Sequence, residues 1–197
     1  MRAATTAAMV LALVAAFVSH ADAEKKEKKI PDLAKLCGMD TDRASDGVFA
    51  KAHGKQWQKF ASVKAVPEDA DSEMAQYWRG EHGGSLVQMA VHDGVYARYH
   101  EYCFGQEGKL SSLTYETRTA HGWGFATTGT VDKNGHLVPA SSRFFGVRTN
   151  MTIPRPAEAD DAPWALDPRI YKRLDKLPFA KLISTPVEQK KQDAQAH

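Results

Sequence analysis

Residues 85–104 read SLVQMAVHDGVYARYHEYCF, in which two runs of alternating apolar and polar side chains are separated by Asp93-Gly94. Alternation with a period of two is typical of a β-strand that buries one face. Asp-Gly between two such runs is a strong signal for a hairpin with a two-residue loop. The stretch therefore predicts antiparallel strands over residues 85–92 and 95–104.

The register of this hairpin decides which side chains share a face of the sheet. A two-residue loop at Asp93-Gly94 pairs His92 with Val95 and places Val87 opposite His100. Residues that lie opposite one another point to the same side. The even-numbered residues of the second strand are therefore expected on the face that also carries Val87.

The same rhythm continues to Thr149, with turn signals at residues 105–108, 120–122 and 132–135. Residues 74–79 form a further strand-like run before the hairpin. Short strands separated by turns at this spacing predict an antiparallel meander. We expect an α+β fold: a curved antiparallel β-meander of about five or six strands, with short N-terminal and C-terminal helices packed on it.

Three segments outside the meander carry helical signals. Pro31 begins a short pattern that stops at Gly38, and Asp167-Pro168 begins one in which Ile170, Leu174 and Leu177 are spaced as on one helix face. Residues 46–63 have near-helical spacing of large apolar side chains, interrupted by two glycines. A helix is the slightly favoured interpretation of that segment.

The N-terminus has the features of a cleaved signal peptide. Arg2 precedes an apolar run over residues 8–18, and Ala21-Asp22-Ala23 is a small-x-small cleavage site. We expect a periplasmic or secreted protein processed near Ala23, and no transmembrane segment is predicted in the mature chain. The predicted organisation is a signal peptide (1–23), a charged tether (24–30), a single α+β domain (31–185) and a disordered tail (186–197).

Charge and cysteine content narrow the function classes. A formal net charge of +2 gives no electrostatic footprint for nucleic acid, and no such partner is predicted. The mature chain holds Cys37 and Cys103, which we expect to form a disulfide in an oxidising compartment. Two separate buried thiols remain the alternative, because sequence does not show whether their Cα atoms approach each other.

The face that carries Val87 also carries two basic side chains among aromatic residues. With the expected register, Arg98 lies opposite Tyr115, and His100 follows one rung along. A buried guanidinium needs a partner, either a protein carboxylate or a ligand anion. The candidate ligand-binding residues are Arg98, His100, Tyr96, Tyr102, Tyr115, Trp123 and Phe125.

A structural interpretation of Arg98 and His100 competes with that one and is slightly favoured. Arg98 then extends to the edge of the sheet, and His100 is a hydrogen-bonded core residue. The histidines lack the compact spacing of a metal site, so neither a metal nor a cofactor is predicted. The Asn150-Met151-Thr152 sequon is a weak match that matters only in a cell that glycosylates secreted proteins.

No motif of a known enzyme class occurs in the sequence. The preferred function is therefore non-catalytic binding of a small apolar, amphipathic or lipid-like molecule on the aromatic sheet face. One alternative is an envelope structural or interaction protein with a filled core, whose protein partner is unknown. A hydrolase or isomerase of unknown substrate is the other.

Overall fold

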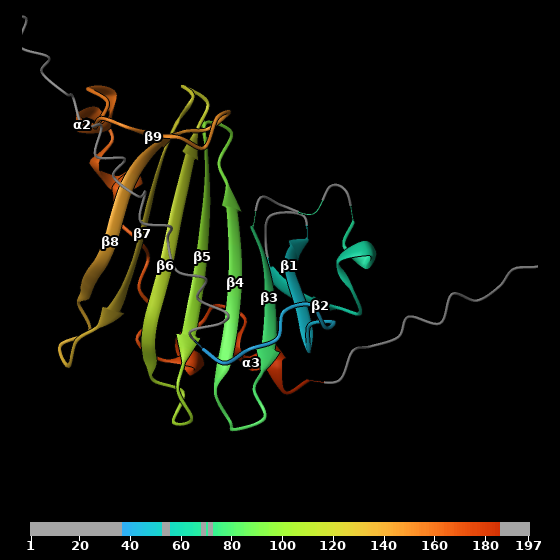
Figure 1. Cartoon of the computed structure of the whole chain (residues 1–197). Helices are drawn as coiled ribbons and strands as arrows, with labels where there is room; N and C mark the ends of the chain where they lie inside the picture. The colour runs from blue at the N-terminus through green and yellow to red at the C-terminus, as the bar shows by residue number, and fades with distance from the viewer. Residues whose placement is uncertain (1–36, 53–55, 68–69, 71–72, 186–197) are drawn as a thin grey trace, which may run out of the picture.

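The computed structural model describes residues 37–52, 56–67, 70 and 73–185, and these form one open antiparallel sheet of nine strands in the order β2-β1-β3-β4-β5-β6-β7-β8-β9 (Figure 1). The β-rich class is as predicted, but nine strands exceed the expected five or six. The strands are β1 (Gly47–Ala52), β2 (Gln56–Phe60), β3 (Glu73–Arg79), β4 (Ser85–His92), β5 (Tyr96–Phe104), β6 (Leu110–Thr119), β7 (Trp123–Val131), β8 (Leu137–Gly146) and β9 (Thr152–Ile153).

The loop of the β4–β5 hairpin lies one residue later than the sequence predicts, which shifts the pairing register by two residues. His92 pairs with Ala97, and the Asp93 amide donates to the Tyr96 carbonyl (3.0 Å), so the two loop residues are Gly94 and Val95. Gly94 has a φ of 83°, which suits the glycine position of a type II′ turn. The Asp93 carboxylate accepts a hydrogen bond from the Tyr96 amide at 2.9 Å and so stabilises this turn.

A shift of two residues preserves the face of every side chain, because the period of a strand is two. Val87 lies opposite Tyr102 instead of His100, and His100 lies opposite Met89. On the next strand, Tyr115 faces His100, where Arg98 was expected. The expected pairs were wrong, but the even-numbered side chains of β5 do share a face with Val87.

The C-terminal part of the chain covers this face, and we call residues 154–185 the C-terminal strap. It runs behind the sheet in Figure 1, in orange and red, from α2 beside β8 to α3 near β3. The strap consists of short elements: α2 (Glu158–Asp161), η2 (Pro163–Leu166), η3 (Leu174–Lys176) and α3 (Ala180–Ile183). Two apolar clusters lie beneath it, one where Leu177 and Phe179 meet β1–β6 and one where Ala159, Ala162 and Ala165 meet Trp123.

The predicted C-terminal helix does not form, because the sheet binds the main chain of the strap. The Leu110 amide donates to the Lys172 carbonyl (3.0 Å), and the Leu174 amide donates to the Gly108 carbonyl (2.8 Å). A helix would use these groups internally. Only the single turn η3 remains of it.

The helix slightly favoured for residues 46–63 is also wrong, since this segment forms the antiparallel pair β1–β2 and ends where the short turn η1 (Val63–Ala65) begins. The large side chains that imitate a helical face are used differently. Phe49 stacks on Phe179 of the strap at 4.6 Å between ring centroids, and Trp57 contacts the same ring at 4.9 Å.

On the other face of the sheet, Cys37 forms the expected disulfide with Cys103 and packs beside Trp78 and Leu86. A disulfide fits a protein that folds in an oxidising, extracytoplasmic compartment. The predicted signal peptide, tether and tail, and residues 31–36 of the expected N-terminal helix, lie outside the described residues. Within the described part of the chain, no helix is long and apolar enough to cross a membrane.

Candidate functional site

A cavity of about 220 Å³ lies between the sheet and the C-terminal strap. Its floor is formed by Met89 and Val91 of β4 and by Arg98, His100 and Tyr102 of β5, and its roof by Asp167, Pro168 and Arg169. Three of the seven residues predicted from sequence to bind a ligand therefore line one cavity.

The sheet register explains why the floor combines apolar and basic side chains. Val91 lies opposite Arg98 and Met89 opposite His100, so two aliphatic side chains of β4 stand beside two basic side chains of β5. Tyr102 follows on the next rung. The cavity thus has an apolar side towards β4 and a polar side towards β5.

The roof is attached to the floor by hydrogen bonds to its main chain. The Tyr102 hydroxyl donates to the Arg169 carbonyl (2.8 Å), and the Arg169 amide donates to Nε2 of His100 (3.3 Å). A third bond runs from the Tyr115 hydroxyl to the Ala165 carbonyl (2.6 Å). Residues 166–168 therefore span the cavity between two fixed points.

The His100 ring is neutral at physiological pH. Only 4 % of the residue is exposed, and burial, together with the charges of Arg169 and Arg98, lowers the pKa of the ring to about 3. Because Nε2 accepts a hydrogen bond, the single proton of the neutral ring is on Nδ1. Nδ1 is buried and has no hydrogen-bond partner among the described residues.

Two tyrosines surround this ring and serve as fixed donors. Tyr102 stacks on His100 with 5.6 Å between centroids, and Tyr115 lies 4.8 Å away at a tilt. Burial raises the pKa of Tyr115 to about 12 and raises that of Tyr102 as well. Both hydroxyls therefore stay protonated and continue to donate to the strap.

The Arg98 side chain has an outer part at the surface and an inner part that is buried. Its Nη2 forms an ion pair with Asp93 at 2.9 Å, and its guanidinium carbon lies 5.6 Å from the ring centre of Trp164. The buried Nε has no hydrogen-bond partner among the described residues. The outer part of the side chain thus forms a surface ion pair, while its inner nitrogen is enclosed by the protein.

The remaining predicted residues lie outside the cavity, in contact with the strap or with β8. Tyr96 meets Trp164 edge-on at 4.5 Å, and Phe125 contacts Phe144 at 5.1 Å. Trp123 packs against the strap alanines, and Tyr115 supports His100 from the neighbouring strand. Most of the expected aromatic wall is therefore covered by the chain itself.

Sequence reasoning missed the roof. Asp167, Pro168 and Arg169 fall where a helix was expected, and no local signal indicates that they fold back over β5. Met89 and Val91 were placed on the correct face but were not chosen as binding residues, because they were indistinguishable from other apolar core positions.

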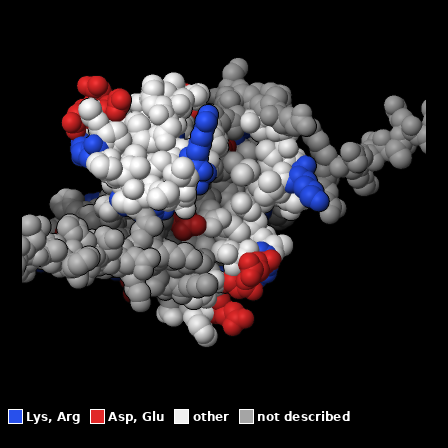
Figure 2. All heavy atoms as spheres, turned by 45° about the horizontal axis from the view of Figure 1, so that its top comes forward, with Lys and Arg blue, Asp and Glu red and all other residues white. Residues whose placement is uncertain are grey.

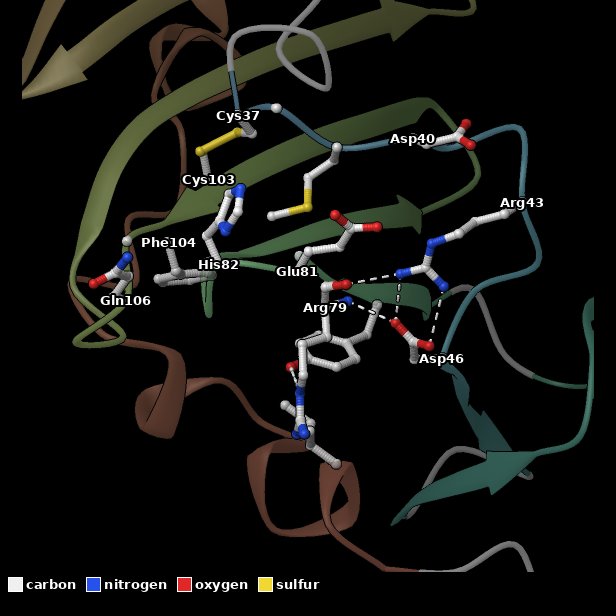
Figure 3. Close-up of a pocket in the computed structure, with 17 residues that line it drawn as sticks. Cys37, Asp40, Arg43, Asp46, Arg79, Glu81, His82, Cys103, Phe104 and Gln106 are labelled. Carbon is white, nitrogen blue, oxygen red and sulfur yellow. Dashed lines mark hydrogen bonds and ion pairs between the residues drawn. A yellow bond between two sulfur atoms is a disulfide. The ribbon is translucent and has the colours of Figure 1, made fainter.

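A second and larger hollow, which we call the end groove, lies between the segment after Cys37 and the ends of β3 and β5 with the turns that follow them (Figure 3). It is open and has a volume of about 990 Å³. Figure 3 shows Arg43 and Asp46 pointing towards each other on one side of it, with the side chains of Glu81 and His82 on the side towards the disulfide. The disulfide forms part of the lining.

Most of the charged side chains in the end groove that Figure 3 joins by dashed lines form hydrogen bonds and ion pairs with one another. Arg43 donates to both carboxylate oxygens of Asp46 (3.1 and 2.9 Å) and to the Arg79 carbonyl (2.8 Å). The Arg79 amide donates to the same carboxylate at 2.6 Å. The hydrogen bond from Arg43 lowers the pKa of Asp46, which keeps this carboxylate ionised and unsuited to act as an acid.

Charged side chains are dispersed over the face of the molecule that Figure 2 shows. In Figure 2, basic and acidic side chains occur in small groups separated by uncharged surface. Within the part of the chain that the structure describes, no group of three or more histidine, cysteine or acidic side chains is placed to hold a metal ion.

The geometry defines an open antiparallel sheet with a small, partly basic cavity beneath a C-terminal strap. No protein-family model matches this chain, and comparisons with curated proteins and with solved structures also found no match.

Proposed function

We propose that this protein binds a small apolar or amphipathic molecule, without transforming it, in the cavity between β4–β5 and residues 167–169. The observation that carries the proposal is the cavity itself, about 220 Å³ beneath a roof held by hydrogen bonds to His100 and Tyr102. Core packing normally leaves few voids larger than a water molecule.

The volume limits the size of the ligand. An apolar cavity of about 150 Å³ accommodates benzene, and drug-sized ligands occupy about 300–1,000 Å³. A cavity of about 220 Å³ therefore suits a single ring with one substituent or a short aliphatic chain. This range favours a small molecule over an extended lipid chain.

A titration of the full chain with benzyl alcohol and with benzoate, followed by amide chemical shifts, tests the proposal. Binding should perturb Met89, Val91, His100 and Arg169, which surround the cavity. Val91→Phe places a ring in the cavity and should abolish these shifts. Val138→Phe, at a position that is 51 % exposed on β8, is the matched control and should leave them unchanged.

Two results would contradict the proposal. One is that neither compound changes the amide chemical shifts of the residues around the cavity. The other is an equal response in Val91→Phe and in the unmodified chain, because that would place the compounds elsewhere.

An exposed apolar group favours the second candidate, an interaction protein. Val95 and Trp164 are 46 % and 47 % exposed, and Trp164 contacts Tyr96 at the same end of the sheet. Tryptophan and tyrosine are enriched in protein interfaces. In this case Trp164→Ala should change self-association in sedimentation velocity, whereas the cavity variant Val91→Phe should not.

A further inference from the structure

Trp164 is the most exposed aromatic residue in the described part of the chain, and its backbone is held in place. The residue is 47 % exposed, whereas the other three tryptophans are buried or half-buried. It lies in η2, and the next residue, Ala165, is fully buried and accepts a hydrogen bond from the Tyr115 hydroxyl at 2.6 Å. An aromatic side chain on such a fixed turn loses little freedom when a ligand binds to it.

The inner side of the Trp164 ring rests on two side chains of β5. Tyr96 meets the ring edge-on with 4.5 Å between centroids, and the guanidinium carbon of Arg98 lies 5.6 Å from the ring centre. Tyr96 and Arg98 are two residues apart in β5, so both project from the covered face of the sheet. The exposed side of the ring therefore points away from the sheet. We call Trp164, Tyr96 and Arg98 the Trp164 shelf.

Charged groups that can form further hydrogen bonds lie beside this shelf. Asp93 forms an ion pair with Arg98 at 2.9 Å, and the two side chains remain 36 % and 23 % exposed. Asp167 is also exposed and follows Trp164 by one 3₁₀ turn, in which side chains three residues apart lie on the same side. Because a carboxylate has about four acceptor sites, Asp93 and Asp167 can each accept more hydrogen bonds.

These surroundings distinguish between the possible occupants of the shelf. Trp164, with Val95 at the same end of the sheet, offers far less apolar surface than the roughly 800 Å² that a stable protein interface buries on each partner. A cation is disfavoured, because the ring already interacts with the Arg98 guanidinium. A small ring with apolar faces and a polar rim fits both the indole and its charged neighbours.

We propose that the Trp164 shelf binds a neutral saccharide, with one pyranose ring stacked on the exposed side of Trp164 and its hydroxyls hydrogen-bonded to Asp93, Arg98 and Asp167. The faces of a glucose-type ring carry only C–H groups, which are attracted to the negative face of an aromatic ring, whereas the hydroxyls lie at its rim. Arg98 and Asp167 also line the cavity, so the shelf borders it. The saccharide itself lies outside the cavity, and its binding does not depend on the proposed function.

Titration of the full chain with cellopentaose, followed by indole N–H chemical shifts and by tryptophan fluorescence, tests the proposal. All hydroxyls on the rings of this glucose oligomer are equatorial, so both faces of each ring are apolar. Binding should shift the Trp164 indole resonance and protect the fluorescence from quenching by acrylamide, because Trp164 is the most accessible tryptophan. Absence of both effects would overturn the proposal, and a shift with tetramethylammonium alone would indicate a cation instead.

Substitutions separate the stacking ring from its polar neighbours, with affinities measured by calorimetry. Trp164→Ala should weaken cellopentaose binding at least about tenfold, and Trp164→Phe, which keeps a smaller ring, should weaken it less. Asp93→Asn keeps an acceptor for the Tyr96 amide but removes the charge paired with Arg98, so it should weaken binding several-fold. Met151→Ala, at a position that is 66 % exposed before β9, is the matched control and should leave the affinity unchanged.

The cavity variant keeps the two proposals distinguishable. Val91→Phe fills the cavity and should not change the affinity for cellopentaose. Equal affinity of Trp164→Ala and the unmodified chain would overturn the shelf as a saccharide site, even if benzyl alcohol binds in the cavity. A change in the sedimentation of Trp164→Ala, with no response of the unmodified chain to cellopentaose, would overturn it in favour of a protein interface.

Discussion

The main-chain amide of Arg169 donates a hydrogen bond to the side chain of His100, and this contact joins the strap to the centre of the sheet. His100 lies in a row of paired residues that crosses the sheet from Phe49 through Ala75, Met89 and His100 to Tyr115. The bond fixes the tautomer of the ring, and with it the direction in which the unpartnered proton is offered.

The buried neutral state of His100 predicts a pH dependence of stability. The pKa of its ring is lowered from 6.5 to about 3 by burial and by two arginines, so between these values the unfolded chain binds a proton that the folded protein does not. The free energy of unfolding should fall as the pH decreases from 6.5, by at most about 1.4 kcal/mol per pH unit, and this group should have no effect above about pH 7.

Urea unfolding of the unmodified chain and of His100→Gln between pH 5 and 7 measures this dependence. The variant should have the shallower slope. Asp46, whose pKa is lowered by Arg43, contributes a slope of the same sign only at lower pH. Parallel slopes in the two proteins would show that His100 is not a buried neutral group.

The hydrogen bond from the Tyr115 hydroxyl to the strap should contribute to the free energy of unfolding. Tyr115→Phe removes the donor to the Ala165 carbonyl and leaves a buried acceptor without its partner, which should reduce the free energy of unfolding by about 1–3 kcal/mol. The matched control is Tyr99→Phe, on the opposite face, where the ring contact with Arg118 is retained. Equal effects of the two substitutions in urea unfolding would contradict a role for this bond.

The disulfide predicts a large stability effect. It links residues that are 66 positions apart, and closing a loop of that length stabilises the folded state by about 4 kcal/mol in the chain-entropy model. Replacing both Cys37 and Cys103 with alanine should lower the midpoint of urea unfolding accordingly. A change below about 1 kcal/mol would show that the crosslink constrains the unfolded chain very little.

The positive φ of Gly94 predicts that replacing this glycine lowers the stability of the protein. Its φ of 83° is disfavoured for residues with a Cβ, and a Cβ at this position meets no heavy atom within 4 Å. The cost of Gly94→Ala is therefore conformational alone, about 1 kcal/mol, and Gly94→Asn should cost less. Equal stability of the glycine and alanine proteins in thermal unfolding would contradict the positive φ.

The central sheet could be predicted because its signals are local. Alternation over 85–104 placed β4 and β5 correctly, and the predicted faces are correct despite the error in register, because the register shifted by two residues. The β-bulges were not visible in the sequence. The one near Cys103 and Phe104 places Leu110 in the core, and the one after Thr128 places Leu137 against the covered face.

The rest of the fold depends on contacts between distant parts of the chain. The spacing of Phe49 and Trp57 resembles a helix, but both side chains meet Phe179, more than a hundred residues later. Likewise, Arg169 lies over β5 only because Tyr102 and His100 bind its main chain. The floor of the cavity was therefore partly predictable, whereas its roof was not.

A crystal structure of the full chain grown with benzoate tests the central claim most directly. We expect benzoate between β4–β5 and residues 167–169, with its ring in contact with Met89 and Val91. A cavity that holds only water while benzoate is in excess, or a strap packed directly onto Met89 and Val91, would contradict it.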